Sequence, residues 1–206
     1  MLFIFNYPKI IFLTYDKEHQ YIFYIGIDKN DKIYDIDYTK SELIKYVSNF
    51  NNTIQFYYMD NIDKGHLTLM WNKLFNIAYE DKCDYFFQCG DDIEFKTKGW
   101  INYCIQTLQK TDNCGLTGPI DENNPQLLTQ SFISRKHMEL FGYYFPPEIM
   151  NWYCDDWINE IYKSINKYYP LKNHLCINRG GEPRYHINHN METIYMELVK
   201  RDLNKM

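Results

Sequence analysis

The sequence lacks the features that mark several common classes of protein. Its six cysteines form no CxxC pair and no metal-ligand spacing, so buried free thiols in a reducing compartment are expected, and a disulfide framework is not. The net charge is −5, so the chain has no basic field to hold a nucleic-acid backbone. We therefore expect no nucleic-acid partner and a cytoplasmic protein.

Long hydrophobic runs are missing as well. The apolar opening, residues 1–15, is interrupted by Asn6, Pro8 and Lys9, and it is shorter than the roughly 20 apolar residues that a membrane helix needs. No repeat, low-complexity tract or linker is present. The chain has 206 residues, of which 45% are hydrophobic, so we expect one compact domain over 1–206 and no membrane span.

Strand and helix signals alternate along the chain. Residues 39–50 carry a T-x-x-E capping box followed by apolar side chains at helical spacing, and Gly142 is expected to end a helix that starts at Arg135. The expected strands are 9–14, 21–27, 53–59, 84–89, 115–120 and 126–133, and the expected helices are 39–50, 65–80, 99–110, 135–142 and 155–166. This alternation predicts an α/β fold with a mainly parallel sheet flanked by helices.

Two adjacent aspartates, Asp91 and Asp92, follow the apolar strand that contains residues 84–87. Ligands of α/β sheets bind at the carboxyl ends of strands, and adjacent carboxylates repel each other unless a positive charge lies nearby. A hard divalent cation, Mg²⁺ or Mn²⁺, would supply that charge. The alternative is a solvated turn, since aspartate is common in turns. The pair alone leaves both interpretations open.

A second acidic pair, Asp155 and Asp156, opens an expected helix. Aspartate at a helix start can accept backbone N–H bonds and suits the positive end of the helix dipole, so capping is one interpretation. The other is a catalytic base that takes a proton from a hydroxyl. The occurrence of both pairs in one α/β chain favours a site in which the first holds a metal–diphosphate and the second acts on an acceptor.

Four segments together resemble the GT-A-fold glycosyltransferases, especially the inverting, family-2-like group. They are a helix that loosely matches a G-x-x-x-x-R-N pattern (65–72), the GDD motif (90–92), an arginine-containing helix ending in glycine (135–142) and CDDW (154–157). The resemblance covers about residues 20–165 and extends to the small nucleotide-sugar transferases of giant DNA viruses, which would place the protein in a host cytoplasm. It implies a GT-A fold with a twisted sheet and a role in glycan biosynthesis.

Carried over by position, the resemblance implies that Asp92 is a ligand of Mn²⁺ or Mg²⁺. It implies that Asp156 is the base and that Asp155 is a helix cap or an acceptor contact. Gly90 stands where the first aspartate of the metal motif is usual, which leaves one carboxylate fewer for the nucleotide. The implied contacts to the nucleotide donor are Asp91, Asp28, Thr14, Asn72 and Arg184.

The segment 178–190 is polar and glycine-rich and carries further candidates. In several GT-A enzymes a histidine after the core completes the metal shell, and His186, or else His189, is similarly placed; a free surface histidine is the alternative. The guanidinium groups of Arg179 and Arg184 could fork onto the donor phosphates or lie solvated.

The aromatic residues beside the second acidic pair and the short connection between the first two strands each have two interpretations. Trp152, Tyr153 and Trp157, beside the second acidic pair, could stack on a sugar, although packing of a helix against the sheet is favoured. Only six residues, 15–20, separate the first two expected strands, which is too few for a crossover helix. These strands could pair as a hairpin, or the nucleotide pocket could be incomplete.

The sequence thus predicts a metal-dependent glycosyltransferase that moves a sugar from a nucleotide-diphosphate donor, a UDP-sugar, to the hydroxyl of a glycan or other acceptor, with inversion. A sugar nucleotidyltransferase is a rival, but it would normally carry a glycine-rich phosphate loop near its amino terminus, and residues 9–20 contain no glycine. A non-catalytic nucleotide- or glycan-binding module is the third possibility.

Overall fold

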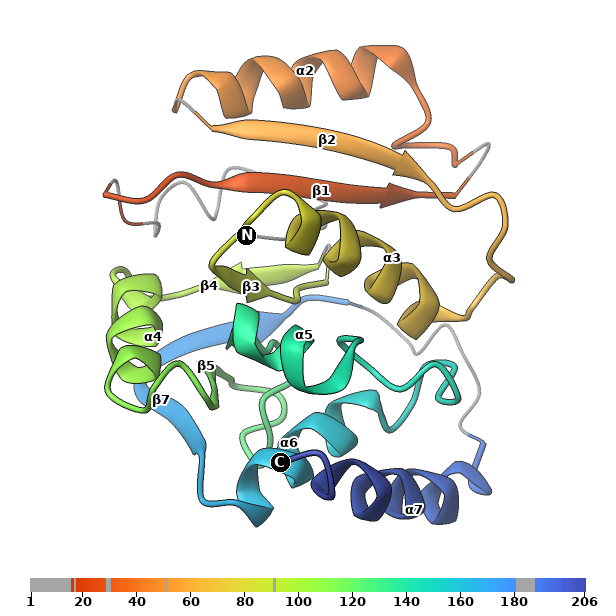
Figure 1. The fold of residues 1–206 in the computed structure, drawn as a ribbon. Helices are drawn as coiled ribbons and strands as arrows, with labels where there is room; N and C mark the ends of the chain where they lie inside the picture. The colour runs from red at the N-terminus through yellow and green to blue at the C-terminus, as the bar shows by residue number, and fades with distance from the viewer. Residues whose placement is uncertain (1–15, 17, 29–30, 51, 91, 181–187) are drawn as a thin grey trace.

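The structure is a computed structural model that describes residues 16, 18–28, 31–50, 52–90, 92–180 and 188–206 (Figure 1). The strand expected at 9–14 lies outside these residues. The described elements, in chain order, are β1 (Ile22–Ile27), α2 (Asp37–Ser48), β2 (Thr53–Tyr58), α3 (Leu67–Glu80), β3 (Tyr85–Phe87), β4 (Ile93–Phe95), α4 (Trp100–Gln109), β5 (Leu116–Asp121), β6 (Phe132–Ser134), α5 (Arg135–Phe141), α6 (Cys154–Ser164), β7 (Tyr168–Asn178) and α7 (Met191–Leu203). The α/β class expected from the sequence is confirmed.

The strands form two sheets, and the larger sheet is mixed. β1 and β2 pair in parallel. In the five-stranded sheet, of order β3-β6-β5-β7-β4, β7 is parallel to β5, whereas β6 is antiparallel to β3 and β5, and β4 is antiparallel to β7. The expectation of a mainly parallel sheet is wrong here. β6 follows its neighbour β5 through a helix-free loop, whereas a parallel neighbour needs a crossover of about a dozen residues or more, and β4 pairs antiparallel with β7 at the sheet's edge.

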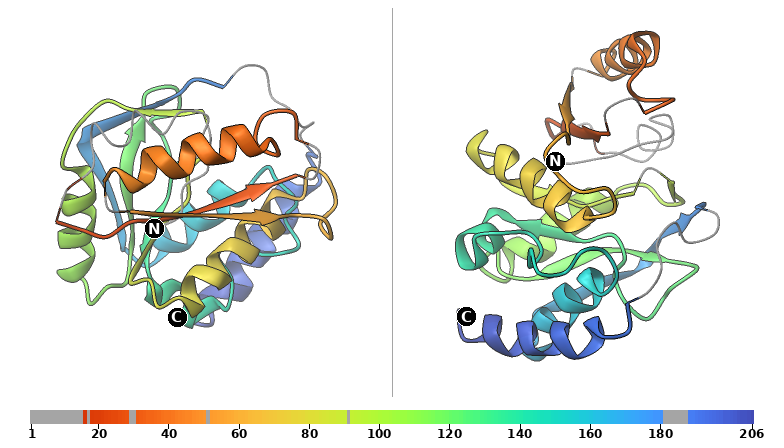
Figure 2. Two further views of the ribbon diagram at one scale, coloured as in Figure 1. Left: turned by 90° about the horizontal axis from the view of Figure 1, so that it is seen from above. Right: turned by 90° about the vertical axis from the view of Figure 1, so that its right-hand side faces the viewer.

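Helices cover both faces of the sheets. One hydrophobic cluster gathers side chains of α3, α5, α6 and α7, and the other gathers those of α2 and α4. Because successive strand residues point to opposite faces, Phe86 lies in the first cluster and Phe87 in the second. Figure 2 shows the layers, with α6 and α7 side by side. Trp157 is fully buried in the first cluster, which confirms its expected packing role.

The helix ends only partly follow the sequence signals. α5 ends as expected at Gly142, which adopts the left-handed conformation (φ 77°) that glycine tolerates best. The capping box expected to start the helix at Thr39 is wrong, because α2 begins at Asp37 after Ile36, whose side chain makes no capping bond. α6 begins after Tyr153, so Asp155 is not its N-cap residue.

Candidate functional site

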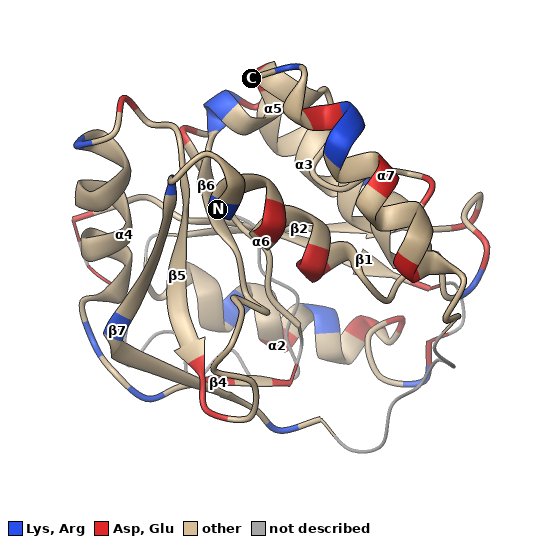
Figure 3. Cartoon of the chain, turned by 90° about the horizontal axis from the view of Figure 1, so that it is seen from below, with Lys and Arg blue, Asp and Glu red and all other residues tan. Residues whose placement is uncertain are grey.

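Polar side chains gather at one edge of the five-stranded sheet. β3, β5 and β7 share a direction, so their carboxyl ends meet at this edge. Asp121 ends β5, Asn178 ends β7, and Asp92 follows β3. The backbone N–H of Arg179 donates to the carbonyl of Asp92 at 2.7 Å, which joins the end of β7 to the Asp92 loop. Figure 3 shows acidic residues at the end of β5 and at the start of α6.

The carboxylate of Asp92 lies between two glycines. A β-carbon added to Gly90 would stand 2.6 Å from Oδ1 of Asp92, and one added to Gly180 would meet Oδ2. A side chain at either position would therefore displace the carboxylate. This close approach gives a physical reason for glycine at position 90, where the resembling enzymes usually carry aspartate.

Asp121 is a buried carboxylate that sequence reasoning did not identify. It is 2% exposed, and it accepts hydrogen bonds from the backbone N–H groups of Asn123 (3.0 Å) and Asn178 (3.3 Å) and from the hydroxyl of Thr129 (3.1 Å). A signal was present: the expected strand 115–120 stops one residue before Asp121, so the same strand-end argument that selected Asp92 applies to it.

Asp155 and Asp156 lie in the first turn of α6, and both are half-buried. Burial, with smaller contributions from the charges of Asp156 and Asp121, raises the pKa of Asp155 to about 7. Burial also raises the pKa of Asp156, whose carboxylate is partly compensated by its own backbone N–H. The two aspartates therefore differ in environment, and Asp155 is the one whose charge is coupled to Asp121 at the sheet edge.

The structure places the Asn72 side chain against the backbone of residues 144–145. Its amide oxygen accepts from the backbone N–H groups of Tyr144 and Phe145, both at 2.9 Å, and its amide nitrogen donates to the carbonyl of Phe145 at 2.7 Å. Asp28 is exposed just after β1. The other predicted donor and metal contacts lie outside the described residues: Thr14, Asp91, Arg184 and His186.

The remaining candidates are dispersed. His189 is exposed just before α7. The guanidinium group of Arg179 forms an ion pair with Glu94 at 2.7 Å. Trp152 is 37% exposed, and the ring of Tyr153 stacks on that of Tyr195 with centroids 5.3 Å apart. Of the three aromatic residues near Asp155, these two thus remain accessible candidates for contact with a sugar.

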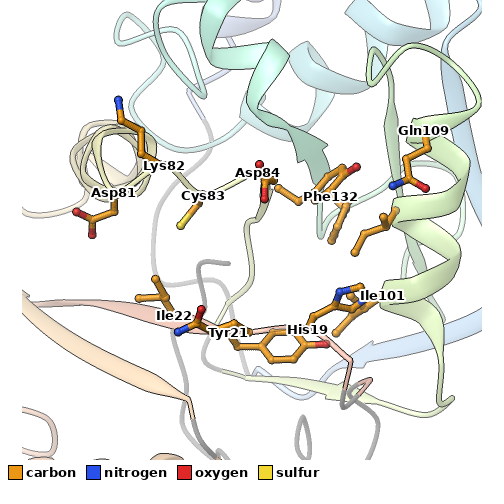
Figure 4. Close-up of a pocket in the computed structure, with 13 residues that line it drawn as sticks. His19, Tyr21, Ile22, Asp81, Lys82, Cys83, Asp84, Ile101, Gln109 and Phe132 are labelled. Atoms are coloured by element: carbon orange, nitrogen blue, oxygen red, sulfur yellow. The ribbon is translucent and has the colours of Figure 1, made fainter.

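A cavity of about 400 Å³ lies elsewhere in the molecule (Figure 4). It is bordered by residues 19–22 at the start of β1, residues 81–85 before and at the start of β3, Phe132 of β6 and one face of α4. The cavity adjoins the amino end of β3, whereas Asp92 follows its carboxyl end. The cavity and the carboxylate cluster are therefore separate features.

The carboxylate edge can be tested for its fit to a divalent cation. Among the described residues, no group of three or more His, Cys, Asp or Glu side chains is arranged to hold a metal ion. Mg²⁺ and Mn²⁺ need less from the protein when a diphosphate supplies ligands, since one or two carboxylates then suffice. Asp92, which follows β3 at the carboxyl edge of the sheet and has no side chain on the neighbouring Gly90 and Gly180, fits such a site.

The sequence was compared with protein-family models and with curated proteins. No protein-family model matches the sequence, and no curated protein is significantly similar to it. No helix in the described ranges is both long and apolar enough to cross a membrane.

Proposed function

We propose that the chain is a metal-dependent glycosyltransferase that moves a sugar from a nucleotide-diphosphate donor, a UDP-sugar, to an acceptor hydroxyl with inversion at the anomeric carbon. The observation that carries the proposal is the presence of two unlike carboxylates, one at the sheet edge and one electrostatically coupled to that edge. Asp92 lies between glycines, and Asp155 is coupled to the buried Asp121. The first suits a metal–diphosphate, and the second suits proton transfer.

Asp92 would hold Mn²⁺ or Mg²⁺ together with the donor diphosphate. When bound, the cation supplies positive charge against the negative charge that develops as the diphosphate leaves. Asp91 and His186 remain predicted contributors to the same site. Gly90 and Gly180 support Asp92 as the main protein ligand, because they place no β-carbon beside either carboxylate oxygen.

Asp155 is the better candidate for the base. The resemblance of CDDW had instead implied Asp156 as the base and Asp155 as a helix cap or an acceptor contact. A general base works best when its pKa lies near the operating pH, and the pKa of Asp155 is about 7. Ionised Asp155 would take the proton of the acceptor hydroxyl as its oxygen bonds to the anomeric carbon. The bond from that carbon to the phosphate oxygen breaks on the opposite face, and this gives inversion.

A thermal-shift assay with nucleotide and metal tests the proposal. UDP should raise the melting temperature in Mn²⁺ and much less in EDTA, since the two ligands bind as one unit and stabilise the native state by mass action. Asp92→Asn should remove the difference. Equal shifts with Mn²⁺ and EDTA would contradict the metal role. Slow Mn²⁺-dependent hydrolysis of UDP-sugars would separate an enzyme from a binding module.

A further inference from the structure

The buried carboxylate of Asp121 joins two hydrogen-bonded arms that lead to the glycines around Asp92. Oδ2 accepts from the hydroxyl of Thr129, and Oδ1 accepts from the backbone N–H of Asn178 and of Asn123. All three donors are neutral. An ionised carboxylate only accepts hydrogen bonds, so Asp121 fixes the direction of every bond that reaches it.

The first arm runs from Asp121 to Gly90. The Thr129 hydroxyl has one proton and donates it to Asp121, so its oxygen is left to accept from the side-chain nitrogen of Gln130 at 3.3 Å. This orients the Gln130 amide so that its oxygen accepts from the backbone N–H of Gly90 at 3.2 Å. Asp121 thus determines the donor and the acceptor of each hydrogen bond in this arm.

The second arm runs from Asp121 to Gly180. Asn178 donates its backbone N–H to Asp121, and its side-chain oxygen accepts from the backbone N–H of Gly180 at 2.6 Å. The two arms therefore hold the backbone on both sides of the Asp92 carboxylate, where each glycine already lies too close to accommodate a β-carbon.

We propose that Asp121 is a positioning residue that, through these two arms, holds the backbone of Gly90 and Gly180 against the Asp92 carboxylate and so places that carboxylate to receive a divalent cation. The inference rests on the metal site of the proposed function. Asparagine is a poor replacement for Asp121, because its NH₂ group would either meet two backbone N–H groups or donate to the Thr129 hydroxyl. In the second case the hydroxyl accepts, and the direction of the bonds in the arm to Gly90 is no longer imposed.

Thr129→Val is the main test, because it is nearly isosteric and keeps the charge of Asp121 while it breaks the arm to Gly90. Partners that orient a metal ligand typically change metal affinity about 10–100-fold when removed, so the Kd for Mn²⁺, measured in the presence of UDP by electron paramagnetic resonance of the free ion, should rise by about 10-fold or more. Asp121→Asn should weaken binding at least as much. Thr129→Ser keeps the hydroxyl and should retain the wild-type Kd.

Thr117→Val is the matched control. Thr117 is buried on β5 and its hydroxyl donates to the carbonyl of Tyr169 at 2.7 Å, outside both arms. Thr117→Val should lower the melting temperature about as much as Thr129→Val and leave the Kd for Mn²⁺ unchanged. Equal weakening in both variants would overturn the inference, because the effect would then be general loss of stability.

Asp92→Asn separates this inference from the function on which it rests. If Asp92→Asn abolishes Mn²⁺ binding but Thr129→Val and Asp121→Asn bind as tightly as the wild type, the positioning role of Asp121 is overturned and the metal site stands. If the wild type binds Mn²⁺ no better than Asp92→Asn does, the metal site itself is overturned and the positioning role falls with it.

Discussion

Asp155, in the first turn of α6, is electrostatically coupled to Asp121, the buried last residue of β5. Burial is the largest cause of the raised pKa of Asp155, and the charges of Asp156 and Asp121 act in the same direction. Folding therefore disfavours the ionised form of this carboxyl group. Such an arrangement is a liability for stability and an advantage for proton transfer near neutral pH, and both effects can be measured.

The raised pKa of Asp155 should make the free energy of unfolding depend on pH. An unfolded aspartate ionises near pH 4, whereas Asp155 holds its proton in the folded state up to about pH 7. The folded state binds more protons than the unfolded state in this window. The contribution of Asp155 to the free energy of unfolding therefore falls as the pH rises from about 4 to 7. Asp155→Asn should therefore gain stability over the wild type across this window, by a few kcal/mol at most. Urea unfolding at pH 4, 5.5 and 8 would measure the difference. A difference that is constant with pH would contradict the raised pKa.

The rate of sugar transfer should depend on the same proton. If Asp155 is the base, kcat/KM rises with pH and levels off above about 7, because only the ionised carboxylate accepts the acceptor's proton. Asp155→Asn should lower turnover by roughly 10²-fold or more while UDP affinity in Mn²⁺ is kept. Asp156→Asn is the matched control and should retain most of the activity. The opposite outcome would restore Asp156 as the base.

His137 should make an opposing contribution to stability. It is buried, its Nδ1 lies 2.8 Å from the hydroxyl of Tyr162 and its Nε2 lies 3.0 Å from the carbonyl of Tyr144; burial lowers its pKa to about 4. In the unfolded state His137 becomes protonated below about pH 6.5, whereas in the folded state it stays neutral down to about pH 4. The free energy of unfolding therefore falls as the pH falls from about 6.5 to 4.

His137→Gln removes this titration. The free energy of unfolding of the wild type should fall relative to that of the variant by on the order of 3 kcal/mol between pH 7 and 4. Chemical unfolding at both pH values gives the double difference, in which the constant cost of the lost packing cancels. A double difference near zero would show that His137 is protonated in the folded state as readily as in the unfolded one.

Sequence patterns predicted the elements whose signals are local. α3 and α6 have a continuous apolar face, and α5 ends at a glycine, so each can be recognised from its own residues. β7 could not be recognised in this way. It contains Pro170 and exposed polar residues, and its pairing with β5 and β4 depends on residues 52 to 85 positions away in the chain, as the pairs Leu171–Pro119 and Asn178–Ile93 illustrate. The three-residue strand β4 has too few residues for any periodicity.

The candidate site was predictable to a similar extent. A strand-end argument located Asp92, and the same argument extended by one residue would have located Asp121. The different environments of Asp155 and Asp156 could not be read from the sequence, because they depend on burial and on charges from other parts of the fold. Nor does the sequence indicate that Tyr153 precedes the helix in the left-handed conformation (φ 74°), which is rare for a residue other than glycine, asparagine or aspartate.

The last prediction concerns Asn72, which the resemblance assigned to the nucleotide and which the structure places against residues 144–145. Asn72→Ala would leave two backbone N–H groups and one carbonyl of that segment without their present partner in a buried region, so the free energy of unfolding should fall by on the order of 2–4 kcal/mol. Asn76→Ala, one turn further along α3 and exposed, is the control and should change stability by less than about 0.5 kcal/mol. The affinity for UDP in Mn²⁺, measured well below the melting temperature of each variant, distinguishes the two roles. Unchanged affinity in Asn72→Ala is expected for a residue that fastens α3 to the segment before α6. A loss of affinity that Asn76→Ala does not share would return Asn72 to the nucleotide site.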